Sequence, residues 1–316
     1  MAGIDCGTNS IRLLVADVDG DRLSDVTRRM EIVRLGQGVD RTGRLAPEAI
    51  ERTRNALAGY AAAIQQHGAE QVRMVATSAT RDAANADDFR VMVKETLGVE
   101  PEVVTGEEEA HLSFTGAVRG LPAGAEPPYL VVDIGGGSTE FVVGAGDVDR
   151  AISVNIGCVR MTERHLHGDP PTGAEVAAAS ADIAAEVDRA LSAVDGRDAA
   201  TTSGQEAATT SGRAATLVGL AGSVTTVAAI ALGLSEYDSA RIHHARIGYA
   251  EVADVTGRLL GMTTAERLAI PVMHPGRADV IGAGALVLRT IMERSGIGDV
   301  IASEHDILDG IAWSLA

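Results

Sequence analysis

The feature that most constrains the fold of this chain is a short unit that occurs twice. Residues 4–15 read IDCGTNSIRLLV, and they align without a gap on residues 132–143, which read VDIGGGSTEFVV. Both copies contain an apolar strand, an Asp, a glycine turn with a Ser, and a second apolar strand. A repeated supersecondary unit predicts two similar halves that face each other across a cleft.

The second copy has the residues of a phosphate- and metal-binding hairpin. Its turn combines glycines, whose N–H groups can approach an anion closely, with hydroxyl donors: Gly135, Gly136, Gly137, Ser138 and Thr139. Asp133 and Glu140 flank the turn and are suited to hold a divalent cation, directly or through bound water. A plain glycine-rich hairpin turn is the alternative for one copy taken alone. The repetition favours the binding site.

The composition narrows the class of protein. A chain of 316 residues is long enough for two domains, each with its own core. The net charge of −17 argues against non-specific nucleic-acid binding, although amides, a cation and a few arginines can still hold small phosphate ligands. Lys94 is the only lysine, and the lysine-containing P-loop motif is absent.

The termini and apolar runs predict a location. No apolar run is long enough to cross a bilayer, and a structural strand begins at Gly3, where a signal peptide would lie. We therefore expect a cytoplasmic protein without a membrane partner. Cys6 and Cys158 lack metal or redox spacing and are expected to be reduced, partly buried thiols.

The order of elements predicts an α/β fold. Strands are expected at 3–7, 11–18, about 30–35, 72–76 and 103–104, with helices over 47–66 and from about 83 to 97. Pro127-Pro128 precedes the second hairpin, so we place one domain at 1–126 and another at 127–316. An Ala/Thr/Ser/Gly tract at about 196–215 is expected to be a surface insert.

Three further features are candidate site elements. Glu107, Glu108 and Glu109 open a helix that runs to about residue 118, where a solvated acidic first turn is the common outcome and catalysis the alternative. Arg81 follows a strand and offers a fork to a phosphate, although a surface role is common there. Gly222 and Ser223 lie at a strand-to-helix junction, which either binds an anion or has Ser223 as an N-cap.

Four stretches resemble successive signatures of the exopolyphosphatase and guanosine pentaphosphate phosphohydrolase (Ppx/GppA) family: IDCGTNSIRLL, ATSATRDAAN, VTGEEEAHLSFTGAV and VVDIGGGSTEFVVG. The family lies within the sugar kinase, Hsp70 and actin superfold. The resemblance implies two RNase H-like domains with the active site in the interdomain cleft. It also implies a homodimer that hydrolyses the terminal phosphoryl group of inorganic polyphosphate, or of guanosine pentaphosphate, with Mg²⁺ and water. Mn²⁺ is the alternative cation.

The resemblance also implies roles for individual residues. Glu109 matches the family's catalytic glutamate, and Glu140 is the second catalytic candidate. Asp133 and Glu140, with Asp5, would place the cation, and Arg81 would bind phosphate. The second hairpin's turn would hold phosphate oxygens together with the first turn, Gly7, Thr8, Asn9 and Ser10, and with Gly222 and Ser223.

The chain departs from the family pattern in places. It lacks the C-terminal helical domains of longer members, which puts processive handling of long polyphosphate in doubt, and GLAGSVTT is a looser form of the second glycine motif. Two other functions compete with hydrolysis. A superfold kinase would share the hairpins, but VTGEEEA argues against it, and a non-catalytic sensor would have lost the carboxylates that this chain retains.

Overall fold

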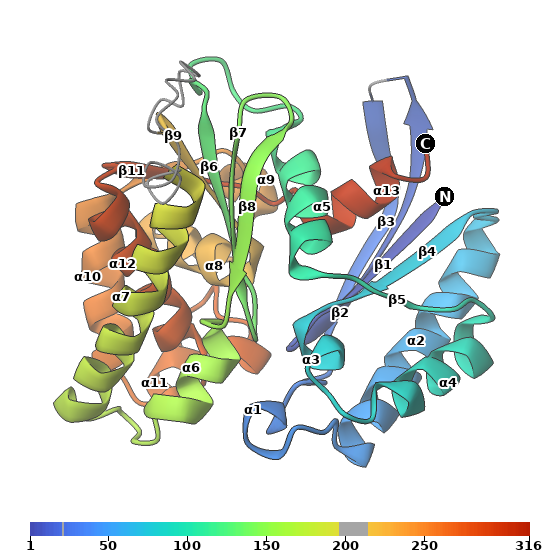
Figure 1. Ribbon diagram of the computed structural model, residues 1–316, viewed down its shortest axis with the longest axis horizontal. Coiled ribbons are helices and arrows are strands. Elements are labelled where there is room, and N and C mark those ends of the chain that lie inside the picture. Colours follow the sequence, from blue (N-terminus) through green and yellow to red (C-terminus); the bar gives the residue numbers. More distant parts are fainter. Residues whose placement is uncertain (21, 196–213) are drawn as a thin grey trace, which may run out of the picture.

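The computed structural model describes residues 1–20, 22–195 and 214–316. Most of the predicted insert at about 196–215 therefore lies outside the described residues. The described chain forms two sheets with helices packed against them (Figure 1). None of its helices is both long and apolar enough to cross a bilayer.

The first sheet has the strand order β3-β2-β1-β4-β5. Its strands are β1 (Ala2–Cys6), β2 (Ser10–Asp19), β3 (Arg22–Ile32), β4 (Val72–Ala76) and β5 (Glu102–Val103). β1, β2 and β3 form an antiparallel meander, whereas β4 and β5 add in parallel after helices. The strand expected at about 30–35 is the end of β3, which starts much earlier and forms a long hairpin with β2.

The second sheet repeats this topology. Its order from one edge is β8 (Val148–Val154), β7 (Thr139–Gly144), β6 (Tyr129–Ile134), β9 (Thr216–Leu220) and β11 (Asp299–Ala302). β10 (Arg246–Gly248) adds antiparallel to β11 at the far edge. The prediction of two RNase H-like α/β halves is confirmed by this shared strand order, with an antiparallel meander followed by parallel strands.

Amphipathic helices cover the outer face of each sheet. The first half has α1 (Val39–Thr42), α2 (Pro47–His67), α3 (Ser78–Arg81) and α4 (Ala86–Leu97). α2 begins with Pro47 in its first turn and ends at Gly68, which adopts a left-handed conformation with φ of 65°. Within α2, Leu57, Tyr60 and Ile64 are buried along one face of the helix, as their helical spacing predicts.

The second half carries more helices than the first. They are α6 (Cys158–His165), α7 (Gly173–Asp195), α8 (Ala221–Ala231), α9 (Ser239–Ile242), α10 (Tyr249–Gly261), α11 (Thr264–Leu268) and α12 (Ile281–Ser295). A 3-10 turn, η2, spans Pro275–Arg277 before α12. The core of this half joins α7, α8, α10 and α12 to one face of the sheet.

Two helices pack on the half opposite to the one that their sequence position suggests. α5 (Gly106–Val118) places Phe114 against Val131 and Val142 of the second sheet. α13 (Ile307–Trp313) returns to the first half, where Leu308 contacts Leu14 of β2. Figure 1 shows the two helices side by side between the sheets. The boundary at 126/127 stays a prediction, and these helices join the halves.

Candidate active site

The two repeated turns contain the same backbone hydrogen bond. The Gly7 N–H donates to the Ser10 carbonyl at 3.0 Å, and the Gly135 N–H donates to the Ser138 carbonyl at 3.1 Å. Within the described residues, the N–H groups of the two residues that follow each of these glycines have no protein acceptor. Unpaired N–H groups in a turn form a concave site for an anion.

The two turns touch each other, which explains two of the glycines. A Cβ atom on Gly136 would lie 2.9 Å from the Cβ of Thr8, and one on Gly137 would lie 2.6 Å from the Ser78 Oγ. Ser78 in turn shares a hydrogen bond of 2.9 Å with the Thr8 hydroxyl. The halves are thus in contact at one end of the cleft, and only residues without a Cβ fit there.

A cavity of about 90 Å³ lies between the turns. It is lined by twelve of the predicted site residues, namely Asp5, Gly7, Thr8, Asn9, Ser10, Glu109, Asp133, Gly135, Gly136, Ser138, Gly222 and Ser223. This volume accommodates a few water molecules or roughly one phosphoryl group. Residues predicted from separate motifs therefore converge on a space of the right size.

Four predicted site residues lie outside the cavity wall. Thr139 is fully buried and its hydroxyl donates to the Ile156 carbonyl, so it does not face the cavity. Gly137 contacts Ser78, as described above. Glu140 is 1% exposed and lies behind the cavity. Arg81 points to the carboxylate of Glu109 instead of to open space. A direct phosphate contact is therefore not supported for the Thr139 side chain.

Hydrogen-bond donors orient Asp133, Glu140 and Glu109. The Ser113 hydroxyl donates to Asp133 at 2.7 Å, and the Ser153 hydroxyl donates to Glu140 at 2.7 Å. Arg81 Nη1 donates to Glu109 Oε2 at 3.0 Å and also to the Val104 carbonyl. These bonds fix each carboxylate while leaving Glu109 and Asp133 on the cavity wall.

Burial gives these carboxylates unusual proton affinities. It raises the pKa of Glu109 well above its ordinary value, repulsion from Glu140 adds to this, and Arg81 opposes it. Burial and Glu140 likewise raise the pKa of Asp133, and burial raises the pKa of Glu140. Burial raises the pKa of Asp5 as well, against the effect of Arg12. Buried carboxylates that repel one another favour protons or a cation nearby.

The donor set suits a hard cation that is shared with a phosphate. No group of three or more His, Cys, Asp and Glu side chains in the described part of the chain is arranged to hold a metal ion. Mg²⁺ commonly binds one or two carboxylates and takes its other ligands from water and substrate phosphates. Asp133 lies on the cavity wall and offers such a carboxylate.

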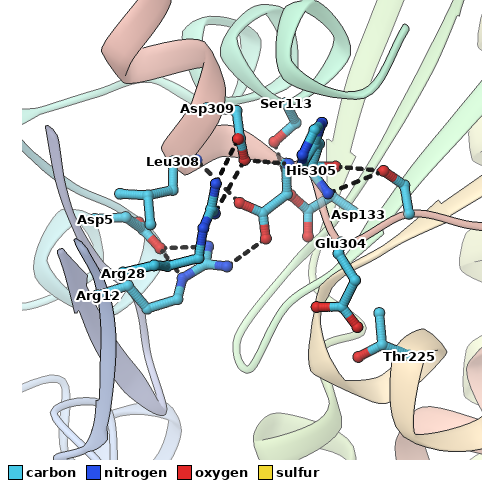
Figure 2. A network of polar contacts seen from close by, with 12 residues as sticks. Asp5, Arg12, Arg28, Ser113, Asp133, Thr225, Glu304, His305, Leu308 and Asp309 are labelled. Atoms are coloured by element: carbon cyan, nitrogen blue, oxygen red, sulfur yellow. Dashed lines mark hydrogen bonds and ion pairs between the residues drawn. The ribbon is translucent and has the colours of Figure 1, made fainter. Parts of the chain in front are cut away.

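Sequence reasoning missed several residues of the site. Arg12 donates to Asp5 from Nε at 3.0 Å and from Nη2 at 2.6 Å, and it also pairs with Asp306 ahead of α13 (Figure 2). Figure 2 also shows Ser113 beside Asp133. A charged residue inside the apolar run IRLLV was the available signal for Arg12. Asp306 gave no signal, since it is distant in sequence.

The α8 junction differs from one of the two predictions for it. Leu220, not Ser223, is the N-cap of α8, so the N-cap interpretation of Ser223 is wrong. Ala221 has a φ of 64°, a region that disfavours residues with a Cβ. Gly222 packs against the guanidinium of Arg277, whose Cζ would lie 2.2 Å from a Cβ there. The junction therefore presents Gly222 and Arg277 together to the cavity.

A second cavity of about 460 Å³ adjoins the first and shares Arg12, Gly222 and Arg277 with it. Further arginines and apolar side chains complete its lining, among them Arg28, Arg29, Met30, Val272 and Met273. The small phosphoryl-sized space thus opens toward a larger, cationic and partly apolar one.

Comparison with known proteins assigns the family. A model of the Ppx/GppA phosphatase family matches residues 14–316. The chain belongs to this family. The Ppx/GppA prediction from the four signatures is therefore confirmed, and the protein is a member of a phosphatase family.

Individual Ppx/GppA relatives align over nearly the whole chain. Exopolyphosphatase 2 of Mycobacterium tuberculosis is 51% identical over 329 residues, covering 100% of this chain and 98% of that protein. A crystal structure of an exopolyphosphatase-like protein is 43% identical with a TM-score of 0.91, covering 99% of this chain and 98% of that one. The Ppx/GppA enzyme of Aquifex aeolicus is 32% identical with a TM-score of 0.78 and covers the same shares.

Proposed function

We propose that this Ppx/GppA protein is an exopolyphosphatase that hydrolyses the terminal phosphoryl group of inorganic polyphosphate. The observation that carries the proposal is the cavity of about 90 Å³, where two amide-lined turns meet the buried carboxylates of Glu109 and Asp133. The 51% identity with a protein named Exopolyphosphatase 2 supports the same substrate.

Glu109 would act as the general base. Arg81 holds one of its oxygens, and the carboxylate faces the cavity, so the other oxygen can accept a proton from an attacking water. A pKa raised by burial makes this carboxylate a stronger base than an exposed glutamate. The water would attack the terminal phosphorus in line with the bond to the leaving phosphate.

The turns would hold the transferred group. N–H groups of residues 8, 9 and 136, with the hydroxyls of Ser10 and Ser138, would bind the terminal oxygens. Mg²⁺, or Mn²⁺ in its place, would be held by Asp133, with Asp5 and Glu140 contributing through bound water. When bound, the cation supplies neutralisation of the charge that develops on the phosphoryl oxygens. Arg277 and Arg12 would face the next phosphates of the chain.

Guanosine pentaphosphate is the second candidate substrate. The cavity of about 460 Å³ favours it, because apolar side chains such as Met30 and Met273 can contact a nucleoside beside arginines that contact its phosphates. A linear polyphosphate uses only the arginines. A non-catalytic sensor of either ligand is a third possibility, which the retained Glu109 and Asp133 disfavour.

Release of orthophosphate with Mg²⁺ distinguishes these functions. Long-chain polyphosphate, short polyphosphate, guanosine pentaphosphate and ATP are compared side by side with the purified protein. Preferential release from polyphosphate is the expected result. Release from guanosine pentaphosphate alone would replace the polyphosphate assignment, and ligand binding without release would establish the sensor.

We further propose a homodimer, on the strength of the family resemblance, and a cytoplasmic location, on the strength of the sequence analysis. Light scattering coupled to size exclusion tests the assembly, and a mass near 65 kDa is expected from two chains of 32.6 kDa each. A mass equal to one chain would contradict it.

A further inference from the structure

We propose that Arg160 is a positioning residue that clasps the two halves together and holds the two phosphate-binding turns in register. Arg160 lies on α6, which follows the second hairpin, and none of the sequence motifs includes it. Figure 1 shows α6 next to α1 at one end of the gap between the sheets. The kinetic part of this inference rests on the proposed exopolyphosphatase activity.

All three guanidinium nitrogens of Arg160 are engaged. Nε donates to the Gly137 carbonyl of the second turn at 2.7 Å. Nη1 donates to Asp40 at 2.6 Å and Nη2 to Asp82 at 2.5 Å, and both aspartates belong to the first half. The Arg160 side chain is only 12% exposed. One planar cation thus joins a phosphate-binding turn of one half to two carboxylates of the other.

Neighbouring groups strengthen the same contact. Arg164, one turn further along α6, donates to Asp40 at 3.1 Å. The carboxylate of Glu163 accepts the N–H of Gly38 from the first half at 3.0 Å. The space among these groups, lined by Thr8, Gly137 and Arg160, is only about 10 Å³. It holds no more than about one water, so the two halves lie close together here.

Helix α3 connects the contacts of Arg160 to the residues that position the base. Asp82 is the C-cap of α3, directly after Arg81, which holds Glu109. Ser78 at the start of α3 packs against Gly137 and the Thr8 hydroxyl. By binding Gly137 and Asp82 together, Arg160 sets the second turn against the segment that positions the base. It touches neither substrate space nor the reacting atoms.

Arg160→Ala is therefore expected to favour an open arrangement of the halves. Part of the binding free energy of the substrate is then used to close the cleft. KM for polyphosphate therefore rises by about the factor by which the closed population falls, and we expect a rise of roughly tenfold. Because bound substrate restores the closed form, kcat is expected to fall less than about threefold. Arg160→Lys retains the charge without the planar guanidinium, so its KM should lie between those of the parent protein and Arg160→Ala.

A distance measurement separates this role from general destabilisation. Spin labels are placed at Gln66→Cys on α2 and Ala181→Cys on α7, which are exposed sites, whereas both native cysteines are buried. Without ligand, the distance distribution of Arg160→Ala should be broader than that of the labelled protein that retains Arg160. Tripolyphosphate should narrow the distribution of the variant. Arg189→Ala, whose partner Glu186 lies on the same helix, is the matched control and should change neither distance nor KM.

Asp82→Ala provides an independent variant if Arg160→Ala folds poorly. It should shift KM and the distances in the same direction, and the double variant should be less than additive, because both changes break one contact. An unchanged distance distribution in both single variants would overturn the proposal, whatever the effect on KM. Absence of phosphate release from polyphosphate by the parent protein would refute the proposed function instead, and the distances would still decide the clasp.

Discussion

Glu109 is one of three consecutive glutamates, yet only its side chain is buried. The reason is local: the Thr105 hydroxyl accepts the N–H of Glu108 as the N-cap of α5, which fixes where the helix begins. Glu107 and Glu108 then face solvent in the first turn, while Glu109 faces Arg81 and the cavity. Spacing alone did not separate these three residues, because it does not show which side of the helix is covered.

Arg81→Gln should change the pH dependence of hydrolysis. Arg81 opposes the effects of burial and Glu140 on Glu109, so its removal raises the pKa of that carboxyl further. A general base is active only when deprotonated, and activity is lost as pH falls through its pKa. The acidic limb of the kcat/KM profile should therefore move to higher pH. A limb that stayed in place or moved to lower pH would contradict the role of this pair.

Much of the site was predictable because its residues follow strand ends and glycine turns. Asp133, Glu109 and the two turns were all expected, and Asp133, Glu109 and most of the turn residues line one cavity. The pairing of Arg12 with both Asp5 and Asp306 was not, because Asp306 lies 294 residues away, just ahead of the last helix. Thr139 was misplaced since its hydroxyl is used within the second half. Which hydroxyls of a turn face inward depends on contacts that the motif does not specify.

The contact between α5 and α13 determines how the halves are joined. A Cβ on Gly116 of α5 would lie 1.9 Å from the Asp306 carbonyl oxygen, and one on Gly310 of α13 would lie 2.0 Å from the Leu112 carbonyl oxygen. The helices therefore approach each other through backbone atoms. Because α5 carries Glu109 and α13 follows Asp306, this crossing sets the base relative to the Arg12 pair.

Gly116→Ala should destabilise the protein by about 2 kcal/mol or more, because the added methyl group overlaps backbone atoms that cannot rotate away. Gly59→Ala is the matched control: Gly59 lies exposed within α2 with no atom near the position of a Cβ. That change should stabilise by about 0.5–1 kcal/mol, since alanine is the better helix former. Chemical denaturation measures both, and equal effects would contradict the close crossing.

The strand order was predictable from the repeat, whereas the crossing of α5 and α13 was not. The boundary was placed at Pro127-Pro128, ahead of the second hairpin, and it puts α5 in the first half and α13 in the second. Phe114 of α5 and Leu308 of α13 are buried against the opposite halves, and the boundary itself stays a prediction. β10 was missed because three residues carry too little periodicity to mark a strand.

Stability of the whole molecule should fall in mild acid through a histidine cluster. His243 stacks on His244 with ring centroids 3.6 Å apart and lies 4.4 Å from His305. Its Nδ1 accepts the N–H of Glu304. Burial first, and then the two neighbouring histidines, lower the pKa of His243 to about 4. The neutral ring is thus the form that fits the folded protein.

His243→Gln should flatten the dependence of unfolding free energy on pH. An unfolded histidine has a pKa of about 6.5, so between pH 6.5 and 4 the unfolded chain binds a proton that folded His243 does not. Stability is then lost as pH falls through this window. The slope of the unfolding free energy against pH, expressed as protons bound on unfolding, should be smaller in the variant by up to roughly one proton. His67→Gln, exposed at the end of α2, is the control. An unchanged slope in His243→Gln would refute this origin.

The central claim is that Glu109 activates water for attack on a terminal phosphoryl group. Arg81 holds this carboxylate on the wall of the cavity between the two phosphate-binding turns. The most direct test is orthophosphate release from polyphosphate with Mg²⁺ by Glu109→Gln, with Glu107→Gln as the exposed control on the same helix. Glu109→Gln should lose activity by at least about a hundredfold while still binding polyphosphate, and Glu107→Gln should retain it. Activity surviving in Glu109→Gln would contradict the account.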